Sequence, residues 1–348
     1  MRKKFSLISL DGTSREIGLK HGKMLKDKIE KTIFFYRRIF KRPEKEILYA
    51  AARFRDCIRA FSKNYSDEIE GIAAGAEIDP LWIYALNSRT EILNTFQNEC
   101  TAICFPTSGI LAQNWDWAKD MEDLLIIMKI TRSDGHKILQ ITEPGIIGKI
   151  GFNSAHMGVT LNFLYIDHKL DGLPVHIILR TLLDAKCLEE GLEKIIGHMS
   201  GKSSNIIFAN ADGKYFNLEF AKDTLHLTRG GHEKFLHTNH FIAAERLNKN
   251  TNKFAGSYSR YDRAKALLSE VGDDISDAKT ILLDKTNEDL AICSKFVPND
   301  EIETLGTICS VIMDLKQMEM HITRGNPFDY PFERIKLDGF AKSHFTRS

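Results

Sequence analysis

The sequence lacks the surplus of basic residues that would predict a nucleic-acid or anionic-membrane partner. Its 48 lysines and arginines are almost balanced by 47 aspartates and glutamates, so the formal net charge is +1. Proteins that bind phosphate-rich polymers or surfaces need a basic surplus or a basic patch. We therefore expect the chain to bind neither nucleic acid nor a membrane.

The sequence also lacks segments that would direct it into or across a membrane. No apolar run is long enough to span a bilayer. The basic residues 1–4 resemble the start of a signal peptide, but the apolar stretch behind them is short and runs into Asp11-Gly12 without a small-residue cleavage site. We interpret this stretch as a first β-strand and expect a cytoplasmic protein.

Cysteine is sparse, and the common cofactor motifs are missing. The six cysteines form no CxxC pair and no dense framework, which is typical of buried free thiols in a reducing compartment. Neither GxGxxG nor GxxxxGK occurs, so nothing predicts a nucleotide cofactor. His237 and His240 lie three residues apart and would face opposite sides of a strand, which argues against a metal site. We expect neither a cofactor nor a metal.

Near residue 100 the spacing of apolar residues changes from a helical to a strand-like pattern. Before it, the first strand is followed by apolar residues at helical spacing; after it, strand-like segments dominate, interrupted by helical regions at about 174–199 and 257–284. This order predicts one α+β domain, residues 1–348, in which helices cover two sheets from both sides, rather than a βαβ chain. The strands are expected at about 100–105, 111–117, 124–131, 137–142, 158–166, 204–210, 214–220, 224–229, 306–315 and 318–324.

Cys100 opens the first of the later strands and is the candidate nucleophile. If the bond between Glu99 and Cys100 is cut, Cys100 gains a free α-amine, and one residue then carries both nucleophile and base. An α-amine titrates near pH ~8 and a thiol near ~8.5, so both groups are usable at neutral pH. The alternative is that Cys100, like Cys104 on the same strand face, is an ordinary small buried side chain.

Asp116 stands near the end of the returning strand, and the length of the hairpin connection decides whether it can serve Cys100. A five-residue connection (106–110) would place Cys100 opposite Asp116 on one face of the sheet. A four-residue connection would place Cys100 opposite Trp115 and point Asp116 away, because a slip of one residue exchanges the two faces. A partnership between Asp116 and Cys100 therefore requires the five-residue connection; otherwise Asp116 is a polar residue at a strand end.

Several stretches, taken in chain order from about residue 99 to 315, resemble one family. They are CTA at 100–102, QNWD at 113–116, TEPGIIGKIGFNSA at 142–155, GLP at 172–174 with HIILR at 176–180, and HTNH at 237–240. With these motifs the chain resembles the acyl-coenzyme A:6-aminopenicillanic acid acyltransferase (isopenicillin N acyltransferase) family of cysteine N-terminal-nucleophile hydrolases. The resemblance implies a four-layer αββα sandwich of two mainly antiparallel sheets, made as an inactive precursor that cuts itself before Cys100.

The resemblance also implies roles for four residues. Cys100 matches the nucleophile, and Asp116 matches the aspartate that orients and activates the N-terminal cysteine. Asn239, in His237-Thr238-Asn239-His240, matches an oxyanion-hole amide. Asn162 falls where related enzymes place the strand that supplies a further oxyanion donor. Such donors are needed where charge develops during attack on a carbonyl.

Two positions depart from the family pattern. Glu99 stands where the penicillin enzymes have glycine, and Thr304 lies near the place of an arginine that this chain lacks. Glycine relieves strain at a scissile bond, so Glu99 predicts slower or absent cleavage. The missing arginine argues against a penicillin-type substrate, because no arginine is then evident to hold a substrate carboxylate.

We therefore predict an autoprocessed cysteine amidohydrolase or acyltransferase that acts on a small-molecule linear amide or acyl thioester through an acyl-enzyme at Cys100. Residues 1–99 would form a mostly helical α-chain segment and residues 100–348 the catalytic β-chain segment. The two segments would stay associated, since separation would expose apolar core. Two alternatives remain open: an uncleaved, non-catalytic binding protein on the same fold, and a hydrolase without self-cleavage that pairs Cys100 with His237 or His240.

Overall fold

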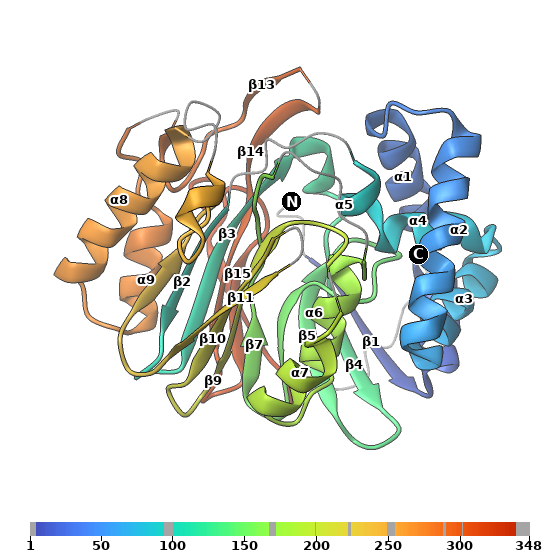
Figure 1. Ribbon diagram of the computed structural model, residues 1–348, viewed down its shortest axis with the longest axis horizontal. Helices are drawn as coiled ribbons and strands as arrows, with labels where there is room; N and C mark the ends of the chain where they lie inside the picture. The colour runs from blue at the N-terminus through green and yellow to red at the C-terminus, as the bar shows by residue number, and fades with distance from the viewer. Residues whose placement is uncertain are drawn as a thin grey trace.

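Two β-sheets pack face to face at the centre of the protein, and helices cover both outer faces (Figure 1). The computed structural model describes residues 5–93, 100–166, 172–198, 200–221, 224–248, 255–287, 290–300 and 302–338. Within these ranges the layers follow the order helix, sheet, sheet, helix, so the expected α+β sandwich is confirmed. Glu99, and with it the expected cleavage position, lies outside the described residues.

The seven-stranded sheet carries Cys100 at the start of a central strand. Its order is β12-β2-β3-β14-β15-β16, with β13 paired to β14, and its paired strands run antiparallel. Every residue of β2 and of β3 is buried, as expected of central strands covered on both faces. The strands are β2 (Cys100–Phe105), β3 (Ile110–Ala118), β12 (Phe235–His237), β13 (Val297–Asn299), β14 (Glu303–Asp314), β15 (Glu319–Thr323) and β16 (Phe332–Lys336).

The nine-stranded sheet has the order β1-β4-β5-β6-β7-β9-β10-β11, with β8 paired to β9. β1 joins β4 in parallel, and the remaining pairs are antiparallel. The strand expected at the start of the chain is confirmed as β1. The strands are β1 (Ser6–Gly12), β4 (Ile126–Arg132), β5 (Lys137–Thr142), β6 (Ile150–Asn153), β7 (Met157–Val159), β8 (Asn162–Phe163), β9 (Ser204–Asn210), β10 (Tyr215–Phe220) and β11 (Leu225–Gly230).

Helices form the two outer layers. α8 (Ala255–Glu270) and α9 (Ile275–Leu282) cover the seven-stranded sheet, while α6 (Val175–Leu183) and α7 (Leu188–Ile195) pack on the nine-stranded sheet (Figure 1). α1 (Ser14–Ile39), α2 (Glu44–Phe61), α3 (Lys63–Ala76), α4 (Pro80–Asn87) and α5 (Arg89–Ile92) gather beside β1. α1 and α3 cross closely at Gly18, where an added Cβ would lie 2.0 Å from the Glu68 carbonyl oxygen. Among the residues described, no helix is both long enough and apolar enough to cross a membrane.

The expected strand at 158–166 is wrong as a single element. It divides into β7 and β8, with Thr160 and Leu161 between them. Gln113, from β3 of the opposite sheet, accepts a hydrogen bond from the Leu161 N–H at 2.9 Å and donates to the Leu161 carbonyl at 2.5 Å. Because this side chain takes the backbone groups that a ladder would use, the strand is interrupted just before Asn162. The short strands β6, β12, β13 and β16 were not expected from the sequence.

The hairpin of β2 and β3 has the four-residue connection. Phe105 lies opposite Ile110 and Cys100 opposite Trp115, so the five-residue register that would pair Cys100 with Asp116 is wrong. The turn explains the choice: the Gly109 N–H donates to the Phe105 carbonyl at 3.0 Å, and Gly109 has φ 73°. A glycine adopts this left-handed conformation without steric penalty, and it closes the loop after four residues.

Candidate active site

Cys100 is the first residue of β2, and its side chain faces the space between the two sheets. Cys100 and Cys104 belong to the core shared by both sheets, whereas Ile103 packs in the cluster beneath α8 and α9. Cys100 is 3% exposed. Trp115 lies opposite Cys100 on β3, and Cys309 lies beyond Trp115 on β14, so these three side chains share one face.

The backbone of Cys100 is held at both its nitrogen and its carbonyl. The Cys100 N–H donates to Asn239 Oδ1 at 2.8 Å. The Cys100 carbonyl accepts from Arg260 Nη1 at 2.7 Å and from Asn162 Nδ2 at 3.1 Å. The structure therefore brings Asn239 and Asn162, both predicted from the sequence, into contact with Cys100, and it adds Arg260, which was not predicted.

The hydrogen bonds around Asn239 fix which way its amide points. Its Oδ1 accepts from the Cys100 N–H and from Arg260 Nη2 at 3.0 Å, and both of these groups are only donors. Its Nδ2 donates to the Phe163 carbonyl at 3.0 Å. In this state Asn239 thus directs its oxygen toward the nitrogen of Cys100, and one of its two amide hydrogens is engaged with β8.

Asn162 sits at the start of β8, where the interrupted strand lets it reach β2. Its Nδ2 donates to the carbonyls of Cys100 and His237, the latter at 3.3 Å. Its Oδ1 is buried and has no hydrogen-bond partner among the described residues. Because an unpaired buried acceptor is unfavourable, this oxygen is open to a further hydrogen-bond donor.

Asp116 lies on the opposite face of β3 from the Cys100 thiol. Its carboxylate accepts from Thr307 Oγ1 at 2.6 Å and from Ser294 Oγ at 3.5 Å. Asn114, two residues earlier on the same face, bonds the Leu282 carbonyl at the end of α9. The backbone N–H of Asp116 nevertheless hydrogen-bonds the thiol, and its carboxylate is near enough to act on the thiol through charge.

These surroundings keep the Cys100 thiol protonated at neutral pH. Burial is the main cause that raises the pKa of the thiol to about 12, and the negative charge of Asp116 adds to it. The hydrogen bond from the Asp116 backbone and the positive charges of Arg260 and Lys149 act in the opposite direction and lower that pKa. In the uncleaved chain the Cys100 thiol is therefore protonated and weakly reactive, although two basic residues lie near it.

Lys149 is one of the two site residues that sequence analysis missed. It is buried between β5 and β6, and its Nζ lies 4.3 Å from the centre of the Trp115 ring, next to Cys100 across the hairpin. Burial, with help from the charge of Arg89, lowers the pKa of Lys149 to about 7. Its signal in the sequence is a single lysine inside the apolar run GIIGKIGF at 145–152.

Arg260 is the other missed residue. It is fully buried on α8, although it stands in a helix rich in exposed charges. Its signal is position: Arg260 lies four residues before Ala264 and seven before Leu267, on the buried face of the helix. Thr304, near the position where the family arginine is absent, lies on β14 opposite Pro298.

The two histidines near Asn239 are engaged elsewhere. His237 Nδ1 lies 2.8 Å from the Thr238 carbonyl, and its Nε2 lies 2.8 Å from Glu219 Oε1. His240 Nδ1 lies 2.8 Å from Ser257 Oγ, and its ring stacks on Tyr258 with centroids 4.1 Å apart. Because both ring nitrogens of His237 already have partners, this residue is poorly placed to take a proton from Cys100.

Two sequence comparisons identify relatives. Residues 104–329 match the model of the family described as acyl-coenzyme A:6-aminopenicillanic acid acyl-transferase. The chain is also 30% identical, over 338 residues, to the 40 kDa form of acyl-coenzyme A:6-aminopenicillanic-acid-acyltransferase from Emericella nidulans, with 92% of each chain covered.

Two solved structures that the chain matches are those of hydrolases. A mutant conjugated bile acid hydrolase from Clostridium perfringens is 12% identical, with 72% of this chain and 97% of that chain covered and a TM-score of 0.48. Penicillin V acylase from Agrobacterium tumefaciens is 10% identical, with 64% of this chain and 82% of that chain covered and a TM-score of 0.41.

Proposed function

We propose that this chain, which belongs to the acyl-coenzyme A:6-aminopenicillanic acid acyl-transferase family, is a self-processed enzyme with Cys100 as its thiol nucleophile. As a member of the family it is an enzyme with acyltransferase or amide hydrolase activity. The observation that carries the proposal is the set of hydrogen bonds on the Cys100 backbone, which we call the clamp. Its N–H donates to Asn239, and its carbonyl accepts from Asn162 and Arg260.

Self-cleavage would begin at the thiol of the uncleaved chain. The deprotonated sulfur attacks the carbonyl carbon of Glu99, and the C–N bond to Cys100 breaks as the nitrogen takes up a proton. The resulting thioester is hydrolysed by water, which leaves a carboxylate on Glu99 and a free thiol and α-amine on Cys100. The hydrogen bond from the Cys100 nitrogen to Asn239 Oδ1 supports this step, because it orients the nitrogen that becomes the amine.

Turnover would then use both groups of Cys100. The α-amine accepts the thiol proton, and the sulfur attacks the substrate carbonyl. The oxyanion receives the second hydrogen of Asn239 Nδ2 and, in place of the 3.3 Å bond to the His237 carbonyl, a hydrogen of Asn162 Nδ2. Collapse of the tetrahedral intermediate expels the amine or thiol of the substrate, which takes the proton back from the ammonium group. Water then hydrolyses the acyl-enzyme, or an amine takes the acyl group. Asp116 acts on this chemistry through its backbone N–H and its charge.

The substrate class that we propose is a linear amide or an acyl thioester. Transfer and hydrolysis share the acyl-enzyme and differ only in the acceptor that reaches it. A penicillin-type substrate is not proposed, because Thr304 stands near the place of the family arginine and carries no positive charge. The buried free thiols Cys104, Cys293 and Cys309 support a reducing, cytoplasmic location.

We also propose that residues 1–99 remain bound after cleavage. Buried side chains join the two segments: Arg180 forms a two-fold hydrogen-bonded pair with Glu68 at 2.8 and 2.9 Å, and Arg89 bonds Glu143 at 2.8 Å. Tyr36 also donates to Glu143, at 2.6 Å. Separation would leave these charges unpaired inside the protein, which is strongly unfavourable.

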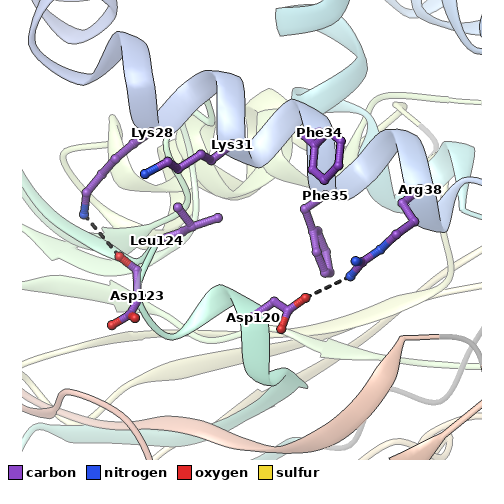
Figure 2. Close-up of a pocket in the computed structure, with 8 residues that line it drawn as sticks. All are labelled: Lys28, Lys31, Phe34, Phe35, Arg38, Asp120, Asp123 and Leu124. Atoms are coloured by element: carbon purple, nitrogen blue, oxygen red, sulfur yellow. Dashed lines mark hydrogen bonds and ion pairs between the residues drawn. The ribbon is translucent and has the colours of Figure 1, made fainter.

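The same seam is visible at the surface (Figure 2). A pocket of about 320 Å³ lies between α1 and the residues that follow β3. Arg38 Nη2 reaches across it to Asp120 Oδ2 at 2.8 Å, and Lys28 Nζ reaches the Asp123 carbonyl at 3.3 Å. Exposed pairs of this kind contribute little each, so the buried contacts carry most of the association.

The proposal is tested by turnover of an N-acyl 4-nitroanilide and an acyl thioester by the wild type and two cysteine variants. Cys100→Ala should abolish turnover and the acyl-enzyme mass, whereas Cys104→Ala, a buried neighbour on the same strand, should retain both. A Cys100→Ala variant that still turns over would contradict the mechanism. The second candidate function is a non-catalytic binding protein, and the raised thiol pKa of about 12 is the observation that favours it. An uncleaved wild type with an unreactive Cys100 would support this candidate.

A further inference from the structure

Arg260 reaches the nucleophile from the outer helical layer, and no family motif named above includes it. It lies on α8, is fully buried, and makes three hydrogen bonds around Cys100. Nη1 donates to the Cys100 carbonyl at 2.7 Å and to Thr101 Oγ1 at 3.1 Å, and Nη2 donates to Asn239 Oδ1 at 3.0 Å. One planar guanidinium thus joins the two sides of the clamp.

The fork geometry of this contact has a structural consequence. A guanidinium can only donate hydrogen bonds, so it fixes the orientation of the Asn239 amide. The Oδ1 atom must point toward Arg260 and toward the nitrogen of Cys100. A new chain terminus is normally poorly ordered unless something ties it down. After cleavage, Arg260 and Asn162 would still hold the Cys100 carbonyl while Asn239 holds the nitrogen, so the terminal residue stays fixed.

The contact also has an electrostatic consequence. The guanidinium carries a permanent positive charge one peptide unit from the position of the freed α-amine. A nearby positive charge disfavours the protonated amine and favours the thiolate. In the uncleaved chain the charge of Arg260 already lowers the pKa of the Cys100 thiol.

We propose that Arg260 is a positioning residue: its guanidinium fixes the backbone of Cys100 and the amide of Asn239, and its charge holds the freed α-amine in the uncharged form that can accept the thiol proton. This inference rests on the proposed function, because it assigns Arg260 to the same site. It would mean that the positive charge at this site comes from α8, whereas the arginine that the family has near the position of Thr304 is absent from this chain.

Other charged groups face Cys100 and set the background for this effect. The Asp116 carboxylate on β3 raises the pKa of the Cys100 thiol and so opposes Arg260. Lys149, in the loop between β5 and β6, lowers this pKa as Arg260 does. Cys309 of β14 lies on the same face, and His237 of β12, which pairs with Glu219 of β10, stands beside β2. Arg260 differs from Lys149 because it contacts the Cys100 backbone directly and cannot lose its charge.

The test separates charge from geometry with two substitutions. Arg260→Gln keeps a hydrogen-bond donor and removes the charge, whereas Arg260→Lys keeps the charge and removes the fork. Arg263→Gln is the matched control, because Arg263 lies on the same helix but pairs with Asp284 at 2.7 Å at a part-exposed position. The readout is the rate of carbamidomethylation of Cys100 in the cleaved protein by iodoacetamide between pH 5 and 10, followed by peptide mass, which needs no substrate.

The proposal expects Arg260→Gln to move the midpoint of the alkylation profile up by about one pH unit. Arg260→Lys and Arg263→Gln should keep the wild-type midpoint. Arg260→Lys should also lengthen the half-time of self-cleavage during cell-free synthesis by roughly tenfold, because its ammonium cannot bridge two acceptors. An unchanged midpoint in Arg260→Gln, or the same shift in Arg260→Lys, would overturn the electrostatic role.

The remaining outcomes also decide the matter. If Arg260→Gln does not fold, Arg260→Lys is tested alone, and a wild-type half-time of cleavage would overturn the positioning role. A wild-type chain that stays whole and unreactive would overturn the proposed function and this role together. A wild type that cuts itself and reacts, beside variants with unchanged profiles, would overturn the role of Arg260 and leave the proposed function standing.

Discussion

The buried pair between Glu68 and Arg180 gives a quantitative test of how the two segments hold together. Glu68 lies on α3, in the segment before the cleavage position, and Arg180 lies on α6, after it. Both side chains are at most 1% exposed, and two hydrogen bonds of 2.8 and 2.9 Å join them. Glu68→Gln would leave the guanidinium buried with a neutral partner.

The expected loss is about 3 kcal/mol of unfolding free energy, at the lower end of the range of about 3–5 kcal/mol for breaking a buried pair. The lower end applies because Arg180 retains bonds to the Ile147 carbonyl at 3.2 Å and to Asp184 at 3.3 Å. The control is Asp67→Asn, one residue earlier on α3, which removes the exposed pair with Lys63 and should change stability by less than about 0.5 kcal/mol.

The assay is equilibrium unfolding in urea, with every variant built on Cys100→Ala so that a single uncleaved chain is compared. In the cleaved protein, Glu68→Gln should also release the N-terminal fragment at a lower urea concentration. The double variant Glu68→Leu, Arg180→Met should recover most of the loss, because the buried charge is then gone. Equal effects of Glu68→Gln and Asp67→Asn would refute the reasoning that buried pairs hold the segments together.

Three further predictions concern Cys100 and its neighbours. Asn239→Ala should lower turnover of a reactive amide by roughly 10²–10³-fold, since it removes an oxyanion donor, and a loss below tenfold in steady-state rates would contradict that role. Self-cleavage of refolded precursor should accelerate by roughly tenfold per pH unit between about pH 7 and 9, because the thiol pKa of about 12 leaves little thiolate; a rate that is flat with pH in intact-mass time courses would contradict it. Lys149→Met should raise the unfolding free energy by a few kcal/mol at pH 7, because burial lowers the pKa of Lys149 to about 7 and the unfolded chain binds more protons above that pH. The stability advantage of Lys149→Met over the wild type, measured in urea, should shrink between about pH 7 and 10, where the wild type gains stability. An advantage that is constant with pH would contradict the lowered pKa of Lys149.

The sequence predicted the hairpin that carries Cys100 but not its register. Apolar residues on both strands define the elements, yet they do not distinguish four connecting residues from five when both faces are buried. The left-handed Gly109 makes that choice, and it turns the Asp116 carboxylate toward α9 and away from the thiol. The five-residue connection that would bring the Asp116 carboxylate to the thiol is therefore not formed, and only the backbone N–H of Asp116 hydrogen-bonds the thiol.

Contacts between distant segments were predictable only in part. Asn239 and Asn162 were found because they lie in stretches that resemble a family, and the structure brings both to Cys100. Arg260 and Lys149 belong to the same site but carry no local signal beyond a charged residue on an apolar face or in an apolar run. Their partners are set by how α8 and the loop before β6 pack against β2 and β3, which spacing along the chain does not specify.

The central claim is that Cys100 becomes an N-terminal residue, and the denatured intact mass of the purified protein tests it most directly. The account predicts two fragments that break between Glu99 and Cys100 in the wild type and a single full-length mass for Cys100→Ala. The two wild-type fragments should elute together under native conditions. A single full-length mass for both proteins would contradict the claim, and it would favour a binding protein that has kept the fold of an enzyme.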